Sequence, residues 1–163
     1  MDPFYNVRIG NVDYFKEVSL EVLLNSRDES GNSLLSKAVL QNDLNCVKVI
    51  YERRPSLLYC ESTEHGYTAL HHATFQSTRD KLEILKFLIN ADAESQGRGA
   101  KKRLTRMRDI YGHAALMIAV KYNKPEAVKL LYAADPDFHH PPNTSDQTPL
   151  KLCMSDSSMQ GKL

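Results

Sequence analysis

Paired cysteines are missing from this sequence, and with them the usual signs of disulfide frameworks and structural zinc sites. The three cysteines, Cys46, Cys60 and Cys153, are an odd number and form no CxxC pair. This pattern is typical of free thiols in a reducing compartment or of small buried residues. The histidines also lack metal-ligand spacing such as HExxH. We therefore expect neither a metal site nor a cofactor.

Long apolar segments and an export signal are also absent from the sequence. The longest unbroken apolar run, residues 114–120, is far shorter than the roughly 20 residues that a membrane-spanning helix needs. Residues 1–5 have neither the basic nor the apolar region of a secretory signal peptide. For the chain as given, we expect a cytoplasmic location.

The sequence carries no motif for nucleotide binding or catalysis. Gly97-Arg98-Gly99 lacks the GK[ST] ending of a P-loop and the strand–helix setting of a Rossmann turn. A catalytic cysteine needs a histidine or another cation beside it, and nothing marks one here. The net charge is only +1, and the one basic cluster is not interleaved with aromatic residues. We expect neither an enzyme nor a nucleic-acid-binding protein.

One short motif occurs four times along the chain. In its clearest form Gly66 is followed by Tyr67-Thr68-Ala69-Leu70-His71-His72-Ala73. Equivalent phrases open at Gly31, Gly112 and Asp146, each with a leucine four residues later and a small residue seven residues later. Successive openers are 35, 46 and 34 residues apart. The spacing indicates a chain built from repeated units.

A second similar segment, present in three of the four units, predicts a second helix in each of them. Val47-Lys48-Val49-Ile50, Leu85-Lys86-Phe87-Leu88 and Val128-Lys129-Leu130-Leu131 are versions of one sequence. Their apolar residues recur at helical spacing, so one face of each helix is buried. Each of these three units is therefore predicted to be a helix–turn–helix, whereas the fourth unit has no second-helix segment.

The motif Thr-x-Leu-His-x-Ala, together with this period, resembles the ankyrin repeat. The resemblance implies an all-α solenoid of helix–turn–helix units, with about three full repeats and degenerate ends. Residues 1–153 would form this domain. Its expected parts are a cap at about 3–27, repeats at about 28–60, 61–92 and 109–138, a partial repeat at 144–153, a basic insertion at 93–108 and a polar tail at 154–163.

Finer details resemble the ankyrin region of plant ankyrin-repeat membrane proteins of the accelerated-cell-death type. They include Arg54-Pro55-Ser56-Leu57-Leu58, Gly97-Arg98-Gly99, and Ala134-Asp135-Pro136-Asp137-Phe138 followed by Asp146-Gln147-Thr148-Pro149-Leu150. This resemblance implies a role in plant defence and cell-death signalling. Members of that family continue with further repeats and membrane helices, whereas this chain departs from them after Cys153. A truncated, non-functional fragment therefore stays open as an alternative.

The ankyrin resemblance also implies how the chain would bind a partner. Ankyrin proteins bind other proteins through their turn tips and the concave face of their first helices, without chemistry. We expect a monomer that binds a protein of unknown identity. The matching positions here are Ser62, Glu64, His65, Tyr67, Asp109, Ile110, Tyr111, His113, Ser145 and Gln147. The alternative is that these residues only form the turns, as His71 is expected to do by bonding backbone between repeats.

The insertion at residues 93–108 is the most distinctive stretch of the chain. Its two glycines and many polar residues predict a projecting loop. Its six basic residues are Arg98, Lys101, Lys102, Arg103, Arg106 and Arg108. The loop is either a solvated surface or a docking patch for an anionic membrane, an acidic protein or calmodulin. Leu104 and Met107 among the cations suit a basic amphipathic helix for the second role.

Overall fold

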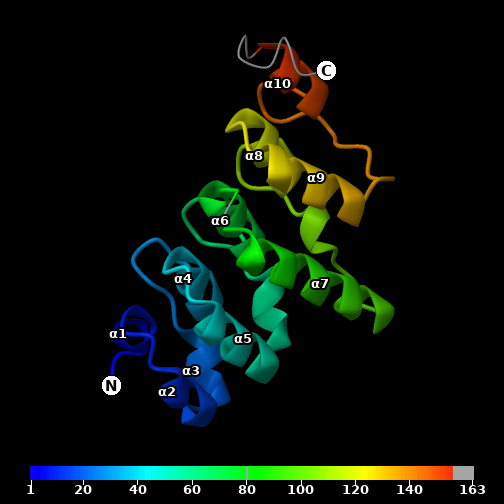
Figure 1. Ribbon diagram of the computed structural model, residues 1–163. Helices are drawn as coiled ribbons and strands as arrows, with labels where there is room; N and C mark the ends of the chain where they lie inside the picture. Colours follow the sequence, from blue (N-terminus) through cyan, green and yellow to red (C-terminus); the bar gives the residue numbers. More distant parts are fainter. Residues whose placement is uncertain (80, 156–163) are drawn as a thin grey trace.

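The computed structural model describes residues 1–79 and 81–155, and within these ranges the ordered elements are all helical. The helices form two rows that run the length of the molecule (Figure 1). The first row consists of α1 (Pro3–Arg8), α4 (Leu34–Leu40), α6 (Ala69–Gln76), α8 (Ala115–Lys121) and α10 (Pro149–Ser155). The second row consists of α2 (Val12–Glu17), α5 (Leu44–Arg53), α7 (Glu83–Gly97) and α9 (Pro125–Ala134). The predicted all-α solenoid is confirmed.

Packing follows the order of the units along the chain. Within a unit the two helices pack together, as α4 does with α5 and α8 with α9. Between units α1 packs on α4, α4 on α6, α6 on α8 and α8 on α10, while α5 packs on α7 and α7 on α9. Each unit therefore buries its apolar face against its neighbours, as in other solenoids.

Short connecting elements complete the described part. Helix α3 (Leu20–Asn25) follows α2 in the predicted N-terminal cap, and the 3-10 helices η1 (Pro55–Tyr59) and η2 (Leu104–Arg106) follow α5 and α7. None of these described helices is both long enough and apolar enough to cross a bilayer.

Local sequence signals explain where several helices begin. The side chains of Asn11, Ser19, Ser33 and Asp43 each accept a hydrogen bond from a backbone N–H in the first turn of the following helix. Such N-caps satisfy donors that have no partner inside the helix. Pro125 occupies the first position of α9, where its missing N–H costs nothing.

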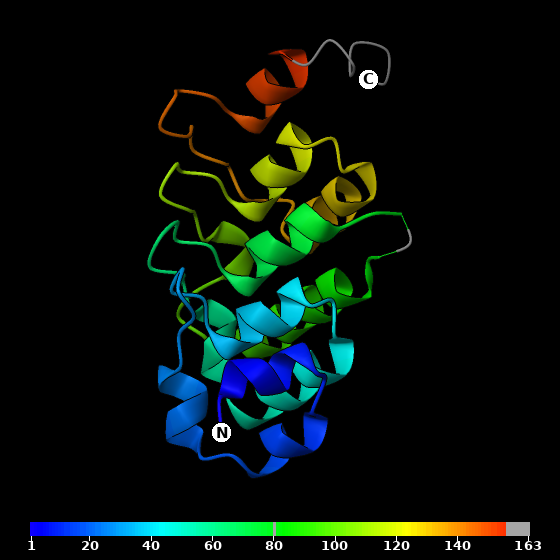
Figure 2. The same cartoon turned by 90° about the vertical axis from the view of Figure 1, so that its left-hand side faces the viewer.

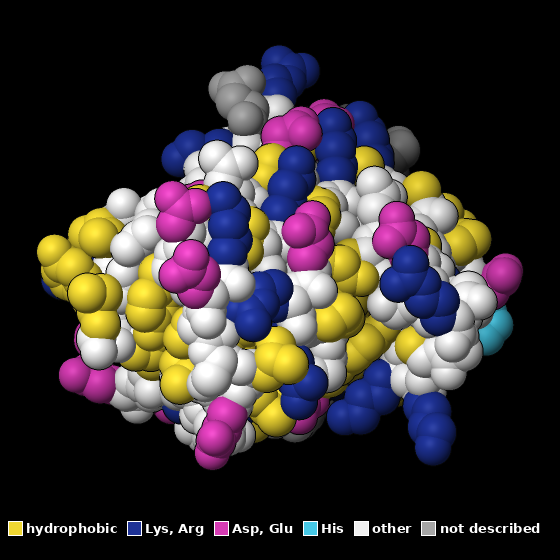
Figure 3. Space-filling model, turned by 90° about the horizontal axis from the view of Figure 1, so that it is seen from below, with side chains coloured by type: hydrophobic (Ala, Val, Ile, Leu, Met, Phe, Trp, Pro, Cys, Tyr) yellow, Lys and Arg dark blue, Asp and Glu magenta, His cyan; other side chains and the backbone are white. Residues whose placement is uncertain are grey.

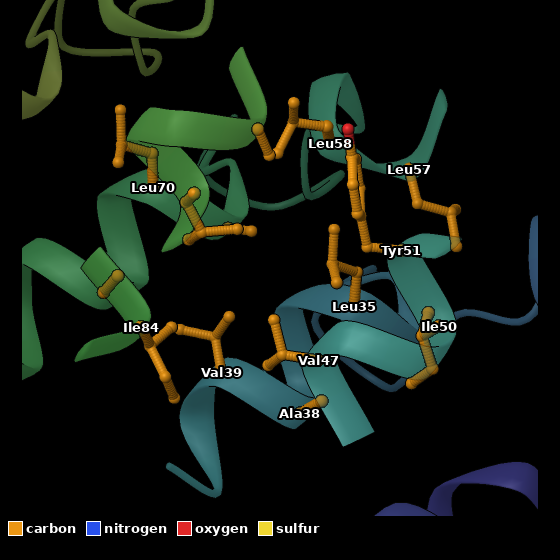
Figure 4. Close-up of a cluster of buried hydrophobic side chains, with 14 of the residues drawn as sticks. Leu35, Ala38, Val39, Val47, Ile50, Tyr51, Leu57, Leu58, Leu70 and Ile84 are labelled. Atoms are coloured by element: carbon orange, nitrogen blue, oxygen red, sulfur yellow. The ribbon is translucent and has the colours of Figure 1, made fainter. Parts of the chain in front are cut away.

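The apolar core lies between the two rows and between successive units. Figure 4 shows side chains from neighbouring units that meet there, among them Leu35 and Val47 of the first full unit and Leu70 and Ile84 of the second. Leu35, Val47 and Leu70 are completely buried. Most of the core forms one cluster that extends from α1 to α9, and Met117, Val120 and Leu152 form a second, smaller cluster between α8 and α10.

Two boundaries differ from the sequence prediction. Helix α7 continues to Gly97, past the predicted end of its repeat at residue 92, because Ala91 and Asp92 are buried and the Ser95 hydroxyl bonds to the Ala91 carbonyl. At the other end α10 includes Ser155, so the first residues of the predicted polar tail are helical. The rest of that tail, residues 156–163, lies outside the described part of the chain.

Candidate protein-interaction surface

Four equivalent turns precede the helices of the first row after α1. In each turn the first residue donates its backbone N–H to the last residue's carbonyl, at 2.8–3.1 Å. A side-chain oxygen of the first residue also accepts the last residue's N–H, at 2.8–3.0 Å. The pairs are Asp28 with Asn32, Ser62 with Tyr67, Asp109 with His113, and Asn143 with Gln147. An oxygen-bearing side chain at the first position therefore closes each turn.

The turn tips at residues 28–32, 62–67, 109–113 and 143–147 form one row, which we call the tip ridge. Backbone bonds join successive tips: Glu64 N–H donates to the Ser30 carbonyl, Ile110 to His65 and Thr144 to Tyr111, at 3.3, 3.0 and 2.9 Å. The tips project to the same side of the molecule, at the left of Figure 2. The ridge is therefore a continuous surface.

Buried histidines connect the units behind the tip ridge. The His71 Nδ1 accepts the Thr68 N–H at 3.1 Å, so its Nε2 carries the proton and donates to the His113 carbonyl at 2.9 Å. The structural role expected for His71 is confirmed. Next to it His72 Nε2 donates to Asn32 Oδ1 at 3.0 Å. Burial lowers the pKa of His71, and it lowers the pKa of His72 to about 4, so both rings are neutral at pH 7.

Five aromatic rings form a series of contacts from the second and third turn tips to the C-terminal ends of α6 and α8. His65 and Tyr67 are stacked, with centroids 5.2 Å apart, and Tyr67 meets Phe75 edge-on at 5.3 Å. Phe75 meets Tyr122 of the next unit at 5.3 Å, and Tyr111 lies 6.5 Å from His65. We call these five residues the aromatic array. Tyr111 and Tyr122 are 45% and 50% exposed, so the array presents aromatic surface to solvent.

A small hollow of about 180 Å³ adjoins the aromatic array between the third and fourth tips. Tyr111 belongs to both, and Lys121 also lines the hollow. The Lys121 ammonium is 5.7 Å from the centre of the Tyr122 ring and forms no ion pair with any residue of 1–79 or 81–155. The full lining is Tyr111, His113, Lys121, Asn143, Thr144, Ser145 and Gln147.

Half of the predicted basic loop is bound into the fold. Asp135, at the end of α9, accepts two hydrogen bonds from Arg106, at 2.7 and 2.9 Å, and one from Thr105 at 3.1 Å. Arg103 lies 3.4 Å from the same carboxylate. The Arg106 guanidinium in particular holds the pKa of Asp135 below its usual range. Arg108 donates to the carbonyls of Gly112 and Pro142, at 2.9 and 2.6 Å.

The prediction of a basic amphipathic helix around Leu104 and Met107 is wrong. Leu104 is fully buried, and the helical turn around it, η2, has only three residues. The Leu104 N–H bonds to the buried Asp92 carboxylate at 3.0 Å, which ties the segment to α7. Of the six basic residues, Arg98, Lys101 and Lys102 are exposed and take no part in the contacts described above.

Comparison with known proteins agrees with this architecture. Residues 7–99 match the family model for ankyrin repeats in three copies, and residues 111–140 match the model for a single ankyrin repeat. The chain belongs to the ankyrin-repeat family. It is also 27% identical over 154 residues to a poly [ADP-ribose] polymerase tankyrase of Caenorhabditis elegans. That match covers 80% of this ankyrin-repeat chain and only 7% of the relative's length.

Ankyrin repeats indicate a protein–protein interaction module, and ankyrin-repeat domains are in general not catalytic. Burial raises the pKa of the Cys46 thiol to about 12, so this cysteine is not a nucleophile at pH 7. Within the described ranges, no three His, Cys, Asp or Glu side chains lie where they could hold a metal ion.

The ten predicted binding positions of this ankyrin-repeat chain fall into two groups. Ser62, Asp109 and His113 are buried and close turns or join units. At the surface of the tip ridge lie Glu64, His65, Tyr67, Ile110, Tyr111, Ser145 and Gln147. The structure therefore assigns a turn-forming role to three positions and leaves seven accessible to a partner.

The sequence predictions do not include Phe75, Lys121 or Tyr122. These residues lie nine or ten positions after Gly66 and Gly112, at the ends of α6 and α8. Aligning the repeats beyond the conserved motif would bring Phe75 and Lys121 to the same position. Such an alignment is the signal that could have identified them.

Proposed function

We propose that this ankyrin-repeat chain binds a protein partner with the tip ridge and the aromatic array together. The observation that carries the proposal is the exposed aromatic surface: Tyr111 and Tyr122 are about half exposed, and Ile110, next to Tyr111 in the chain, is exposed as well. Exposed apolar patches of this kind mark interaction surfaces. Tyrosine also supplies a large contact area with few rotatable bonds, so little conformational entropy is lost on binding.

Charge supports recognition by shape and aromatic contact rather than by a strong field. The net charge is +1. Seen from the end that carries α1 to α3, acidic and basic side chains are interspersed on the surface (Figure 3). Long-range steering of a partner needs a surface dominated by one sign of charge.

The test compares capture of proteins from a cell extract by the purified chain and by two variants. Replacing Tyr67 and Tyr111 together with serine should lower the amount of captured partner at least about tenfold, since aromatic anchors dominate interface energies. Tyr132→Ser is the matched control, because Tyr132 is 59% exposed on α9 of the other row. Circular dichroism would verify that both variants are folded. Equal capture by all three proteins would refute the proposal.

A role in plant defence and cell-death signalling, at a cytoplasmic location, is the finer form of this proposal. Its support is the sequence resemblance at residues 54–58, 97–99 and 134–138. The polymerase activity in the name of the Caenorhabditis elegans relative gives no support for such an activity in this chain, because the similarity spans 7% of that protein.

Binding to an anionic membrane surface is a second candidate, carried by the exposed trio Arg98, Lys101 and Lys102. The trio adjoins a hollow of about 380 Å³ beside Tyr59. At about 1 kcal/mol for each basic residue near such a surface, three cations give weak binding at low salt. Calmodulin binding has no such support, because the amphipathic helix that it requires does not form at Leu104.

Vesicles containing phosphatidylserine test the second candidate. Replacing the trio with glutamine should abolish binding, whereas the same replacement at the exposed Lys16, Lys48 and Lys129 should leave most of it. If both triple variants bind alike, the trio has no special role.

A further inference from the structure

We infer that the 180 Å³ hollow holds one carboxylate side chain of an extended partner segment, whose neighbouring residues lie on the aromatic array. The inference rests on the proposed function and adds the chemistry of the partner: an aspartate or glutamate at a fixed distance from apolar or aromatic residues.

The lining of the hollow favours a negative group. Its one charged side chain is Lys121, which has no ion-pair partner in the described part of the chain. Asp146, which lies in sequence between the lining residues Ser145 and Gln147, is paired with Lys151 at 3.1 Å. Asp109 is buried, and its carboxylate accepts the N–H groups of Tyr111 and His113. A ligand carboxylate would therefore meet a cation with which no acid in the described part of the chain is paired.

Neutral groups of the lining add hydrogen-bond donors. Asn143 Nδ2 lies 3.1 Å from Gln147 Oε1, so the Gln147 oxygen accepts and its NH₂ group is left as a donor. Thr144 and Ser145 contribute exposed hydroxyl groups. Hydrogen bonds to a carboxylate are stronger than those to a neutral acceptor. These groups suit the ligand that Lys121 attracts.

The size of the hollow selects a single side chain. Small-molecule sites are usually about 300–1,000 Å³, larger than the 180 Å³ found here. A hollow of this size beside a long exposed surface is the arrangement expected for one anchored residue of a longer segment.

The aromatic array provides the binding surface for the partner residues that follow the acid. Tyr111 lines the hollow and lies 6.5 Å from His65, the next ring of the array. Alternate side chains of an extended chain point to the same face about 6.6 Å apart. A segment with its carboxylate in the hollow would thus place successive same-face side chains over Tyr111 and then over His65 and Tyr67.

Selection from a random twelve-residue peptide display library on the purified full chain tests the inference. We expect the enriched peptides to carry aspartate or glutamate at one position, followed by apolar or aromatic residues at alternate positions. Selection on Lys121→Glu should favour lysine or arginine at that position. Lys48→Gln, at an exposed lysine on α5, is the matched control and should select the same peptides as the unchanged chain.

A double-mutant cycle with one enriched peptide measures the contact itself. Replacing the peptide's acid with its amide should weaken binding to the unchanged chain about fivefold to tenfold, and should have little effect on Lys121→Gln. An enriched set that needs Tyr111 but shows no acid preference, or a cycle without coupling, would overturn the inference and leave the proposed function standing. If no peptide is enriched, the inference is also overturned, and the capture experiment with the tyrosine variants decides the proposed function separately.

Discussion

His72 shows how a single buried ring ties two ankyrin units together. It lies on α6, 8% exposed, and its Nε2 donates to Asn32 in the preceding turn. Burial is the main cause of its low pKa, and the neighbouring His71 lowers the pKa further. A second proton would place a positive charge on a buried ring, so burial couples the protonation state of His72 to the stability of the stack.

Acid should therefore destabilise the fold before most carboxylates titrate. The pKa of His72 is about 4 in the folded chain against about 6.5 unfolded, so the unfolded state binds more protons between these values. The contribution of His72 is complete above pH 6.5 and is lost as the pH falls towards 4. We expect the free energy of unfolding to fall by about 2 kcal/mol from this residue between pH 7 and pH 5.

Urea unfolding at a series of pH values measures this effect. His72→Gln, whose amide can still donate to Asn32, should reduce the slope, with His71 supplying the remainder. His139→Gln is the control, because it removes an exposed histidine outside the network. An unchanged slope in His72→Gln would contradict the assignment.

Two glycines with the same backbone conformation should respond differently to alanine. Gly31 and Gly99 have φ of +76° and +82°. A Cβ at Gly31 would lie 2.6 Å from the Thr63 backbone nitrogen in the next tip, whereas a Cβ at Gly99 meets nothing within 4 Å. Left-handed strain alone costs about 1–2 kcal/mol.

We expect Gly99→Ala to lower the free energy of unfolding by about 1 kcal/mol and Gly31→Ala by about 3 kcal/mol or more, as measured by chemical denaturation. Equal losses would mean that the close approach between the first two tips is not required.

Helix α9 and the segment after α7 are held together by the Asp135 carboxylate. Its partners Arg103, Thr105 and Arg106 lie about thirty residues earlier in the chain. The sequence predicted a projecting loop, but through this contact the basic insertion acts as a brace between the second and third units. The cations that it occupies are not available to bind an external anion.

Asp135→Ala should release that brace. The change leaves Thr105 and Arg106 without their acceptor, and we expect the free energy of unfolding to fall by about 2 kcal/mol. Limited digestion with trypsin should also cut faster after Arg103 and Arg106. Asp137→Ala, at an exposed acid on the same stretch, is the control. Resistance to trypsin equal to that of the unchanged chain would show that other contacts hold the segment.

The position of a unit in the stack determines how much its copy of the motif contributes to the stability of the fold. The motif leucine is fully buried at Leu35 and Leu70, partly buried at Leu116, and 63% exposed at Leu150. Helices α4, α6 and α8 each pack between two first-row helices, whereas α10 packs on α8 on one side. The same residue in the same local structure therefore has a different energetic role at the end of the stack.

Leu70→Ala should cost about 3 kcal/mol of unfolding free energy, as is usual for a buried leucine, and Leu150→Ala less than about 0.5 kcal/mol. Thermal or urea denaturation of the two variants checks this contrast. Similar losses at both sites would mean that Leu150 is covered in the folded chain.

Local features made much of this fold predictable. The spacing of the leucine and the small residue, and the apolar face of the second helices, identify the units. Caps such as Ser33 and turn residues such as Gly66 act within a few positions of themselves. The seven accessible positions on the tip ridge followed from the same motif.

What the sequence determined by itself was the repeat, its helices and the order of its turns, because the forces that form them act between neighbouring residues. Tertiary structure alone decided which cations stay free and which rings touch. Asp135 binds Arg106, and Phe75 reaches Tyr122, only because stacked units bring distant residues together. Such contacts depend on the packing of one unit against the next, which no local pattern encodes.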